Sequence, residues 1–231
     1  MGRSIIISGT GTDIGKTAVS LAICLCAKEL GLKVAYYKPI QCGLEKTDAN
    51  QLRIMAPSLC DTFETYRFKT PASPHYAAEQ ENTSIHMEAL KEQCVALQKT
   101  YDLVIIEGAG GAAVPWNRQG YSITDFSVAL KLPILLVASP GLGTLHHTLS
   151  THAYIQQKQA EIAGFLFSQT TSESSPLAKD NAQIIQTLTA WTFWGMLPFL
   201  SRIDASHPLP PKDKELWIQS ILPAMTTWWK A

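Results

Sequence analysis

The chain has 231 residues, of which 46% are hydrophobic, and its 19 Lys and Arg side chains balance its 19 Asp and Glu side chains. This length suffices for one sizeable α/β domain with a full hydrophobic core and is short for two, so we expect residues 1–231 to form one domain. The zero net charge gives no electrostatic argument for binding nucleic acid or an anionic membrane, and any anion site must therefore be local.

The cysteines number five, an odd count, and their spacing does not match that of paired metal ligands. We expect them to be free thiols in a reducing compartment: Cys24, Cys26, Cys42, Cys60 and Cys94. The N-terminus lacks a basic region followed by a long apolar stretch, and no run of about 18 apolar residues occurs. These features predict a soluble, cytoplasmic protein.

Short apolar runs alternate with segments of helical periodicity along the chain, which is typical of parallel strands joined by crossover helices. Several of the runs are apolar continuously rather than alternately, as expected when helices cover both faces of a sheet. The sequence therefore predicts an α/β fold with a mostly parallel central sheet. The expected strands are residues 4–9, 33–39, 102–108, 133–139, 163–169 and 193–198.

The helical pattern is clearest from Lys16 to Leu30, and Gly31 follows it where a C-cap glycine would stand. Pro223 weakens the last of the other expected helices. These helices are Leu145–Gln157, Leu177–Leu188 and Glu215–Trp228, and the expected long loops are Phe68–Asn82 and Ser201–Pro211.

A glycine-rich turn, GTGTDIGKT at residues 9–17, connects the first expected strand to the first expected helix. Glycines permit close backbone approach, so successive N–H groups and the helix N-terminus can converge on an anion. An ordinary tight turn would not need the ending Gly15, Lys16 and Thr17, which indicates a phosphate-binding loop. Lys16 would reach the β and γ phosphates of a nucleoside triphosphate, and the Thr17 hydroxyl would ligate Mg²⁺.

A magnesium ion needs carboxylate ligands in addition to one hydroxyl. Glu107 ends an apolar strand and so stands at the carboxyl edge of the sheet, where open α/β folds bind ligands. Asp48 follows the second strand in a polar loop, with Glu45 close by as an alternative. The competing interpretations are a solvated strand end for Glu107 and an ordinary turn residue for Asp48.

Lys38 ends the second expected strand, and Pro39 should stop that strand behind it. Its ammonium group should point over the same carboxyl edge, although a solvated lysine is the alternative interpretation. Lys16 and Lys38 together would give a neutral protein one concentrated positive site.

The chain resembles the dethiobiotin synthetases over residues 4–200. Five segments carry the resemblance in the order and spacing of that family: GTGTDIGKT (9–17), YYKPIQCG (36–43), PASPH (71–75), VIIEGAGG (104–111) and GLGTLHHTL (141–149). The resemblance implies a homodimeric P-loop NTPase-like protein that uses ATP, Mg²⁺ and CO₂ to close the ureido ring of 7,8-diaminononanoate.

The chemistry that the resemblance implies needs no protein nucleophile. The diamine captures CO₂ as a carbamate, the γ-phosphoryl group of ATP passes to the carbamate oxygen, and the second amine attacks the mixed anhydride and expels phosphate. The enzyme must bring two anions together, which cationic groups and a metal achieve by offsetting charge and fixing the approach.

The resemblance also implies roles for individual residues. Lys16 would serve the phosphates, Lys38 would hold the carbamate, and Thr12 would lie near both. The implied metal ligands are Thr17, Asp48 and Glu107, the implied nucleotide site is Gly11, Thr12, Asp13, Ile14, Gly15, Lys16, Thr17, Ser168 and Pro198, and the implied substrate site is Lys38, Cys42, Gly108, Gly143, Thr144 and Leu145.

Backbone N–H groups at the helix that Gly143, Thr144 and Leu145 open would hold the carboxylate tail of the substrate. In the family the cleft is shared across the dimer, and the resemblance places Pro74 and His75 near its reacting end.

The sequence departs from the family pattern at several positions. Cys42 replaces a serine that hydrogen-bonds the substrate, and Gly11 replaces an aspartate. The stretch between Gly43 and Asp48 is shorter than usual. After the strand at 163–169, Ser168-Gln169 replaces an Asn-Asp pair whose amide reads adenine, so the base preference stays open.

Two other classes of protein are alternative interpretations, the first of them with the same fold. ATP-driven switch or partitioning proteins carry an additional lysine early in the phosphate loop, where this chain has Gly9-Thr10-Gly11-Thr12. Amide-forming synthetases of the cobyrinate type carry an appended glutaminase domain, for which too few residues remain. The sequence therefore favours the dethiobiotin synthetase interpretation.

Overall fold

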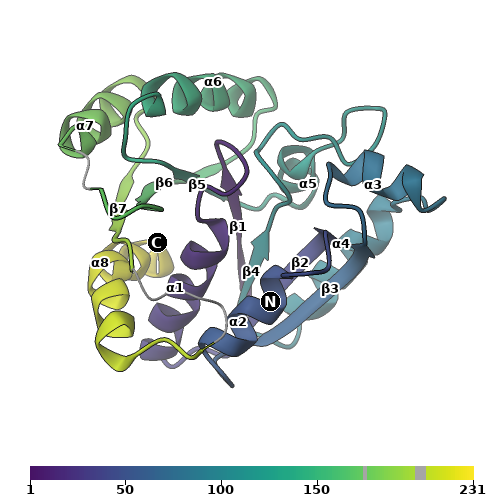
Figure 1. Ribbon diagram of the computed structural model, residues 1–231, viewed down its shortest axis with the longest axis horizontal. Helices are drawn as coiled ribbons and strands as arrows, with labels where there is room; N and C mark the ends of the chain where they lie inside the picture. The colour runs from purple at the N-terminus through teal and green to yellow at the C-terminus, as the bar shows by residue number, and fades with distance from the viewer. Residues whose placement is uncertain (174–175, 201–206) are drawn as a thin grey trace.

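The computed structural model describes residues 1–173, 176–200 and 207–231. Their strands form one seven-stranded sheet in the order β3-β2-β4-β1-β5-β6-β7, and each strand runs parallel to its neighbours. This confirms the predicted parallel α/β fold (Figure 1). The strands are β1 (Arg3–Gly9), β2 (Val34–Cys42), β3 (Asp61–Phe68), β4 (Leu103–Glu107), β5 (Ile134–Ala138), β6 (Ile162–Ser168) and β7 (Phe193–Leu197).

Helices cover both faces of the sheet. On one face α1, α2 and α8 pack against alternate strand residues such as Ile5 and Ile7, and on the other face α3 to α7 pack against residues such as Ile6 and Leu136. Figure 1 shows α1 beside α8 and α6 beside α7. The helices are α1 (Lys16–Glu29), α2 (Asp48–Met55), α3 (Pro74–Gln80), α4 (Met87–Gln98), α5 (Ile123–Leu130), α6 (Thr144–Gln157), α7 (Ala178–Thr189) and α8 (Pro211–Lys230).

The helix α1 is buried over nearly its whole middle section, because it lies between the sheet and α8. It ends as the sequence predicts. Gly31 adopts a φ of +72°, its N–H donates to Lys28 O at 2.9 Å, and the Leu32 N–H donates to Ala27 O at 3.0 Å. These bonds satisfy carbonyl groups that the end of the helix would otherwise leave unpaired.

The strand β2 runs on to Cys42, so the prediction that Pro39 stops it is wrong. The pairing of β2 with β4 ends at Tyr37, and the pairing with β3 continues from Lys38 to Ile40 without using Pro39. A proline is tolerated at such a position because its missing N–H would face no partner strand.

The prediction of a continuous loop from Phe68 to Asn82 is also wrong, because α3 forms within it. Pro74 stands at the first helical position, where its lack of an N–H costs nothing, and Ala77 and Ala78 are buried against the sheet. In a similar way α8 continues through Pro223, since Trp217, Ile221 and Met225 hold it in the core.

The expected loop Ser201–Pro211 lies partly outside the described residues, and Pro211 is the first residue of α8. No helix of the described residues is both long and apolar enough to cross a membrane. All five cysteines are free thiols, and Cys24, Cys26 and Cys94 are buried.

Candidate active site

The predicted phosphate loop joins the end of β1 to the start of α1, beside the carboxyl ends of β4 and β5. Gly15 has a φ of +92°, and a Cβ atom there would lie 2.1 Å from Ser168 Oγ, so only glycine fits. The Gly9 carbonyl accepts the Ala112 N–H at 3.0 Å, and Lys16 Nζ donates to the Gly11 carbonyl at 2.8 Å. The loop is thus packed against β6, bonded to the segment after β4, and braced internally by Lys16.

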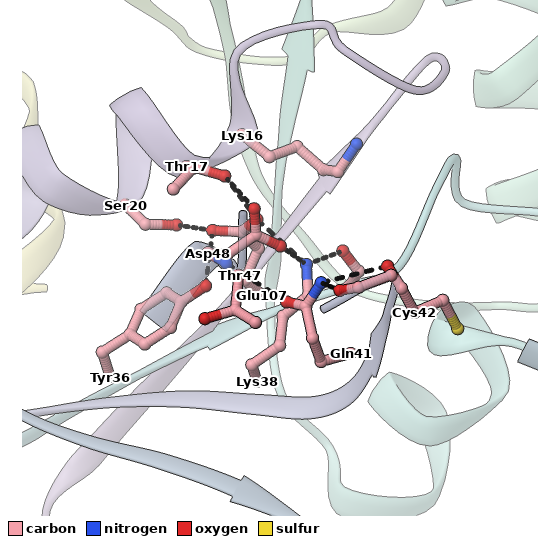
Figure 2. A network of polar contacts seen from close by, with 12 residues as sticks. Lys16, Thr17, Ser20, Tyr36, Lys38, Gln41, Cys42, Thr47, Asp48 and Glu107 are labelled. Atoms are coloured by element: carbon pink, nitrogen blue, oxygen red, sulfur yellow. Dashed lines mark hydrogen bonds and ion pairs between the residues drawn. The ribbon is translucent and has the colours of Figure 1, made fainter. Parts of the chain in front are cut away.

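Two carboxylates converge on the first turn of α1. Thr17 Oγ1 lies 2.9 Å from Asp48 Oδ1 and 3.0 Å from Glu107 Oε1. The second oxygen of Glu107, Oε2, accepts hydrogen bonds from Ser20 Oγ at 2.7 Å and from Tyr36 Oη at 3.0 Å. Figure 2 shows these side chains pointing toward one another from α1, α2, β2 and β4. Glu107 is therefore fixed in orientation at the edge of the sheet.

Lys38 lies between the same two carboxylates. Its Nζ is 2.5 Å from Asp48 Oδ2 and 3.1 Å from Glu107 Oε1, and it donates to the Gly108 carbonyl at 3.1 Å. Lys38 is only 4% exposed. A buried ammonium group needs such partners, because an unpaired charge in the protein interior is costly.

Gln41 braces the connection between β2 and α2. Its Nε2 donates to the carbonyls of Cys42 at 3.1 Å and Gly43 at 3.0 Å, and its Oε1 accepts the Asp48 N–H at 3.2 Å (Figure 2). The Thr47 side chain caps α2. The sequence had suggested that Asp48 lies in a loop, but it is the first residue of α2. Glu45 is exposed and lies outside this network.

The charged groups in this network shift one another's pKa values. Burial lowers the pKa of Lys38, but Glu107 and Asp48 outweigh it and hold the pKa of this ammonium group above its usual range. Burial raises the pKa of Asp48, but the charge of Lys38 and the hydrogen bonds from Lys38 and Thr17 bring it below its usual range. For Lys16, burial dominates and lowers the pKa, with Lys38 adding to the effect.

These residues line one cleft of about 850 Å³. The phosphate loop from Thr12 to Thr17, Lys38, Cys42, Asp48 and Glu107 all face it. Burial raises the pKa of the Cys42 thiol to about 11, so this side chain is a neutral hydrogen-bonding group near pH 7. The cleft thus joins the predicted phosphate-binding loop to the predicted reacting end of the substrate site.

Other predicted site residues lie outside the lining of this cleft. Ser168 is buried against Gly15, and the Pro198 carbonyl accepts the Trp217 Nε1–H at 3.2 Å. Gly143 precedes α6, which Thr144 and Leu145 open as expected. Their functional roles stay predictions.

The segment with Pro74 and His75 forms the start of α3. Ser73 lines the cleft, whereas Pro74 is buried, and His75 Nδ1 lies 3.3 Å from the Pro115 carbonyl oxygen.

Three residues of this network were not expected from the sequence: Ser20, Tyr36 and Gln41. Helical spacing could have found Ser20, which lies one turn after Thr17. Strand alternation could have found Tyr36, which shares the face of Lys38. Nothing in the local pattern points to Gln41, since its role depends on how the following connection folds back.

The donor atoms near Thr17 suit a magnesium ion. A hydroxyl and two carboxylates are the oxygen ligands that Mg²⁺ prefers, and substrate phosphates usually complete its shell. The described residues contain no group of three or more His, Cys, Asp or Glu side chains placed to hold a metal alone. The Thr17 hydroxyl and the two carboxylates would leave coordination positions for the phosphates of a nucleotide.

A family model and several relatives match most of the chain. Residues 3–207 match the family described as an AAA domain, AAA_26. The chain is 35% identical over 211 residues to the ATP-dependent dethiobiotin synthetase BioD of Geobacillus kaustophilus, covering 88% of each chain. It is 32% identical over 220 residues to the protein of the same name from Halalkalibacterium halodurans, covering 92% of this chain and 90% of the relative.

Among solved structures, the chain is similar to the septum site-determining protein MinD of Pyrococcus horikoshii complexed with Mg-ADP. The TM-score is 0.64 at 16% identity, and the match covers 98% of this chain and 96% of that one. At this identity the likeness concerns the fold.

Proposed function

We propose a course of reaction from the premise that this chain belongs to the family of ATP-dependent dethiobiotin synthetases. Such an enzyme is a cyclo-ligase that carboxylates 7,8-diaminononanoate and closes its ureido ring, with conversion of ATP to ADP and phosphate. The alternative, an ATPase switch, is not favoured, because the likeness to MinD is one of fold at 16% identity.

The reaction has three balanced steps. One amine of the diamine adds to CO₂ and loses a proton, which gives a carbamate. A carbamate oxygen then attacks the γ-phosphorus of ATP, and ADP leaves. The second amine attacks the carbonyl carbon of the resulting mixed anhydride, the C–O bond to phosphate breaks, and a proton is lost as the ring closes.

The phosphate loop is assigned to the triphosphate. Its backbone N–H groups and the start of α1 suit the β and γ phosphates, and Lys16 would leave the Gly11 carbonyl to contact the phosphoryl group in transfer. Thr12 lines the same cleft and is proposed to lie near both reactants. Gly11, Asp13, Ile14, Gly15 and Thr17 complete this part of the nucleotide site, and Ser168 and Pro198 are proposed to lie near the base.

The placement of Lys38 is the observation that supports this proposal most strongly. Its ammonium group is buried at the carboxyl edge of the sheet, lines the same cleft as Lys16 and stays protonated through its contacts with Asp48 and Glu107. Such a fixed cation can hold a carbamate oxygen in line with the γ-phosphoryl group. Cys42 and Gly108 are proposed to contact the same end of the substrate.

The proposed metal ligands are Thr17, Asp48 and Glu107. A magnesium ion bound there would neutralise charge that develops on the phosphates during transfer. Ser20 and Tyr36 hold Glu107 in position through its second oxygen, and Gln41 holds the backbone of Asp48.

The carboxylate tail of the substrate is proposed to lie at the start of α6, on the backbone N–H groups of Gly143, Thr144 and Leu145. We propose a homodimer in which this site and the Pro74–His75 segment complete a cleft between subunits.

Phosphate release tests the function. With ATP, Mg²⁺ and bicarbonate, the protein should release phosphate only when 7,8-diaminononanoate is added, and mass spectrometry should detect one dethiobiotin per phosphate. Phosphate release that DNA or lipid vesicles stimulate, and that does not depend on the diamine, would instead support the alternative of an ATPase switch.

A further inference from the structure

The cleft contains a third lysine that the proposed reaction has not yet used. Lys46 lies on the connection between β2 and α2 and lines the cleft together with Lys16 and Lys38. Unlike them it is exposed, and it has no hydrogen-bond or ion-pair partner among the described residues. Its ammonium group is therefore available to a ligand.

The charge of the cleft shows why a third cation matters. Three carboxylates and three lysines line it: Asp13, Asp48, Glu107, Lys16, Lys38 and Lys46. Asp48 and Glu107 both contact Lys38, so most of its charge is already balanced within the protein. A triphosphate and a carbamate bring several further negative charges to this space, and a third ammonium group would add to what Lys16, Lys38 and a bound magnesium ion offset.

The backbone that carries Lys46 is held at both ends. Gln41 bonds to the carbonyls of Cys42 and Gly43 before it and to the N–H of Asp48 after it. Thr47, the next residue, is buried and caps α2. Lys46 is thus an exposed side chain on a braced segment at the rim of the cleft, which lowers the entropy lost when it binds an anion.

We propose that Lys46 is a third cation of the site and contacts an oxyanion of the reacting groups, the γ-phosphoryl group of the nucleotide or the carbamate of the substrate. This inference rests on the proposed function for the identity of the anion. Charge-assisted contacts of this kind are the stronger hydrogen bonds in proteins.

The test compares Lys46→Ala with Lys46→Arg and with Lys99→Ala, a matched loss of one exposed lysine outside the cleft. We expect kcat/KM to fall about tenfold in Lys46→Ala, to fall little in Lys46→Arg and to stay unchanged in Lys99→Ala. The difference in kcat/KM between Lys46→Ala and wild type should become smaller as the salt concentration rises, because salt screens an exposed charge.

Binding measurements identify the anion. Contact with the γ-phosphoryl group predicts that Lys46→Ala weakens the affinity for a non-hydrolysable ATP analogue and leaves that for ADP unchanged. Contact with the carbamate predicts unchanged affinity for both nucleotides and a raised KM for the diamine.

The inference is overturned if Lys46→Ala matches Lys99→Ala in turnover and in binding of the ATP analogue. Failure of the wild-type protein to make product from the diamine would instead refute the proposed function. The two failures are separate observations, because calorimetry with the ATP analogue needs no turnover.

Discussion

Lys38 Nζ lies 3.1 Å from Glu107 Oε1, and the two side chains are 5% and 1% exposed. A buried ion pair is weak support for stability, because desolvation of both charges offsets most of their attraction. Glu107 ends β4, Lys38 lies in the middle of the neighbouring strand β2, and both side chains face the cleft of the phosphate loop. The position of this pair is better explained by a need for fixed charge in the cleft.

Lys38→Met should abolish ring closure and also destabilise the protein. It leaves Asp48 and Glu107 without their shared cation, so we expect a loss of about 3–5 kcal/mol in the free energy of unfolding. Turnover should fall by a factor of about 10² or more while ADP still binds. Urea unfolding, calorimetry with ADP and the ring-closure assay measure the three quantities.

Lys91→Met is the control for Lys38→Met, because it removes a lysine from an ion pair with Glu88 at the protein surface. The free energy of unfolding should change by about 0.5 kcal/mol or less. An equal loss in both variants would refute the special role of the buried pair.

Lys16→Met should separate function from stability. Burial lowers the pKa of Lys16, so the folded protein carries its charge at a cost near pH 7, and a neutral side chain of similar length removes that cost. We expect the ligand-free variant to be at least as stable as wild type, while affinity for ATP and turnover both fall. A clearly less stable variant that still binds ATP normally would contradict both the unfavourable burial of the Lys16 charge and the contact of Lys16 with the triphosphate.

Gly15→Ala should destabilise the phosphate loop by about 1–3 kcal/mol, since the residue has a positive φ and its new Cβ would meet Ser168. Gly11→Ala is the matched change in the same loop, because a Cβ at that position meets nothing within 4 Å. Thermal unfolding of the ligand-free proteins should rank Gly15→Ala well below Gly11→Ala. Equal melting temperatures would contradict the close packing of Gly15 on β6.

The stability gap between wild type and Asp48→Asn should depend on pH. Contacts with Lys38 and Thr17 lower the pKa of Asp48 against the effect of burial, so the folded state favours the ionised carboxylate. That stabilisation is fully present above the unfolded pKa of about 3.9 and is lost as pH falls below it toward the folded pKa.

Urea unfolding of both proteins at a series of pH values measures this gap. Near neutral pH, Asp48→Asn should be less stable by about 1–3 kcal/mol, and the gap should shrink at acidic pH. A gap that is the same at pH 7 and pH 3 would show that the ion pair does not stabilise the fold.

The sequence predicted the centre of the site because its signals are local. Gly15, Lys16 and Thr17 form a motif in consecutive residues, and Glu107 ends β4 as the apolar run predicts. Lys38 reaches the same site, although β2 continues beyond it to Cys42. The structure brings Asp48 to the same point, although its helix was not foreseen. The contacts of Ser20, Tyr36 and Gln41 depend on how separate segments meet.

The parts of the fold that the sequence did not predict are those where packing outweighs local preference. The edge strand β3 is half-buried along most of its length and lacks a continuous apolar run. The helices α2 and α5 are short, with 8 residues each, whereas α4 was missed although it is as long as α7. Pro39 and Pro223 lie inside elements that they would be expected to end. In each case neighbouring strands or core contacts supply the missing stabilisation.

In the proposed reaction, cations of this cleft bring a carbamate oxygen to the γ-phosphorus of ATP. A single turnover with ¹⁸O-labelled CO₂ tests it directly, because the carbamate oxygen that accepts the phosphoryl group leaves with phosphate when the ring closes. Mass spectrometry of the released phosphate should find one ¹⁸O atom from CO₂ in each molecule. Phosphate that carries no label, released while dethiobiotin forms, would contradict the account.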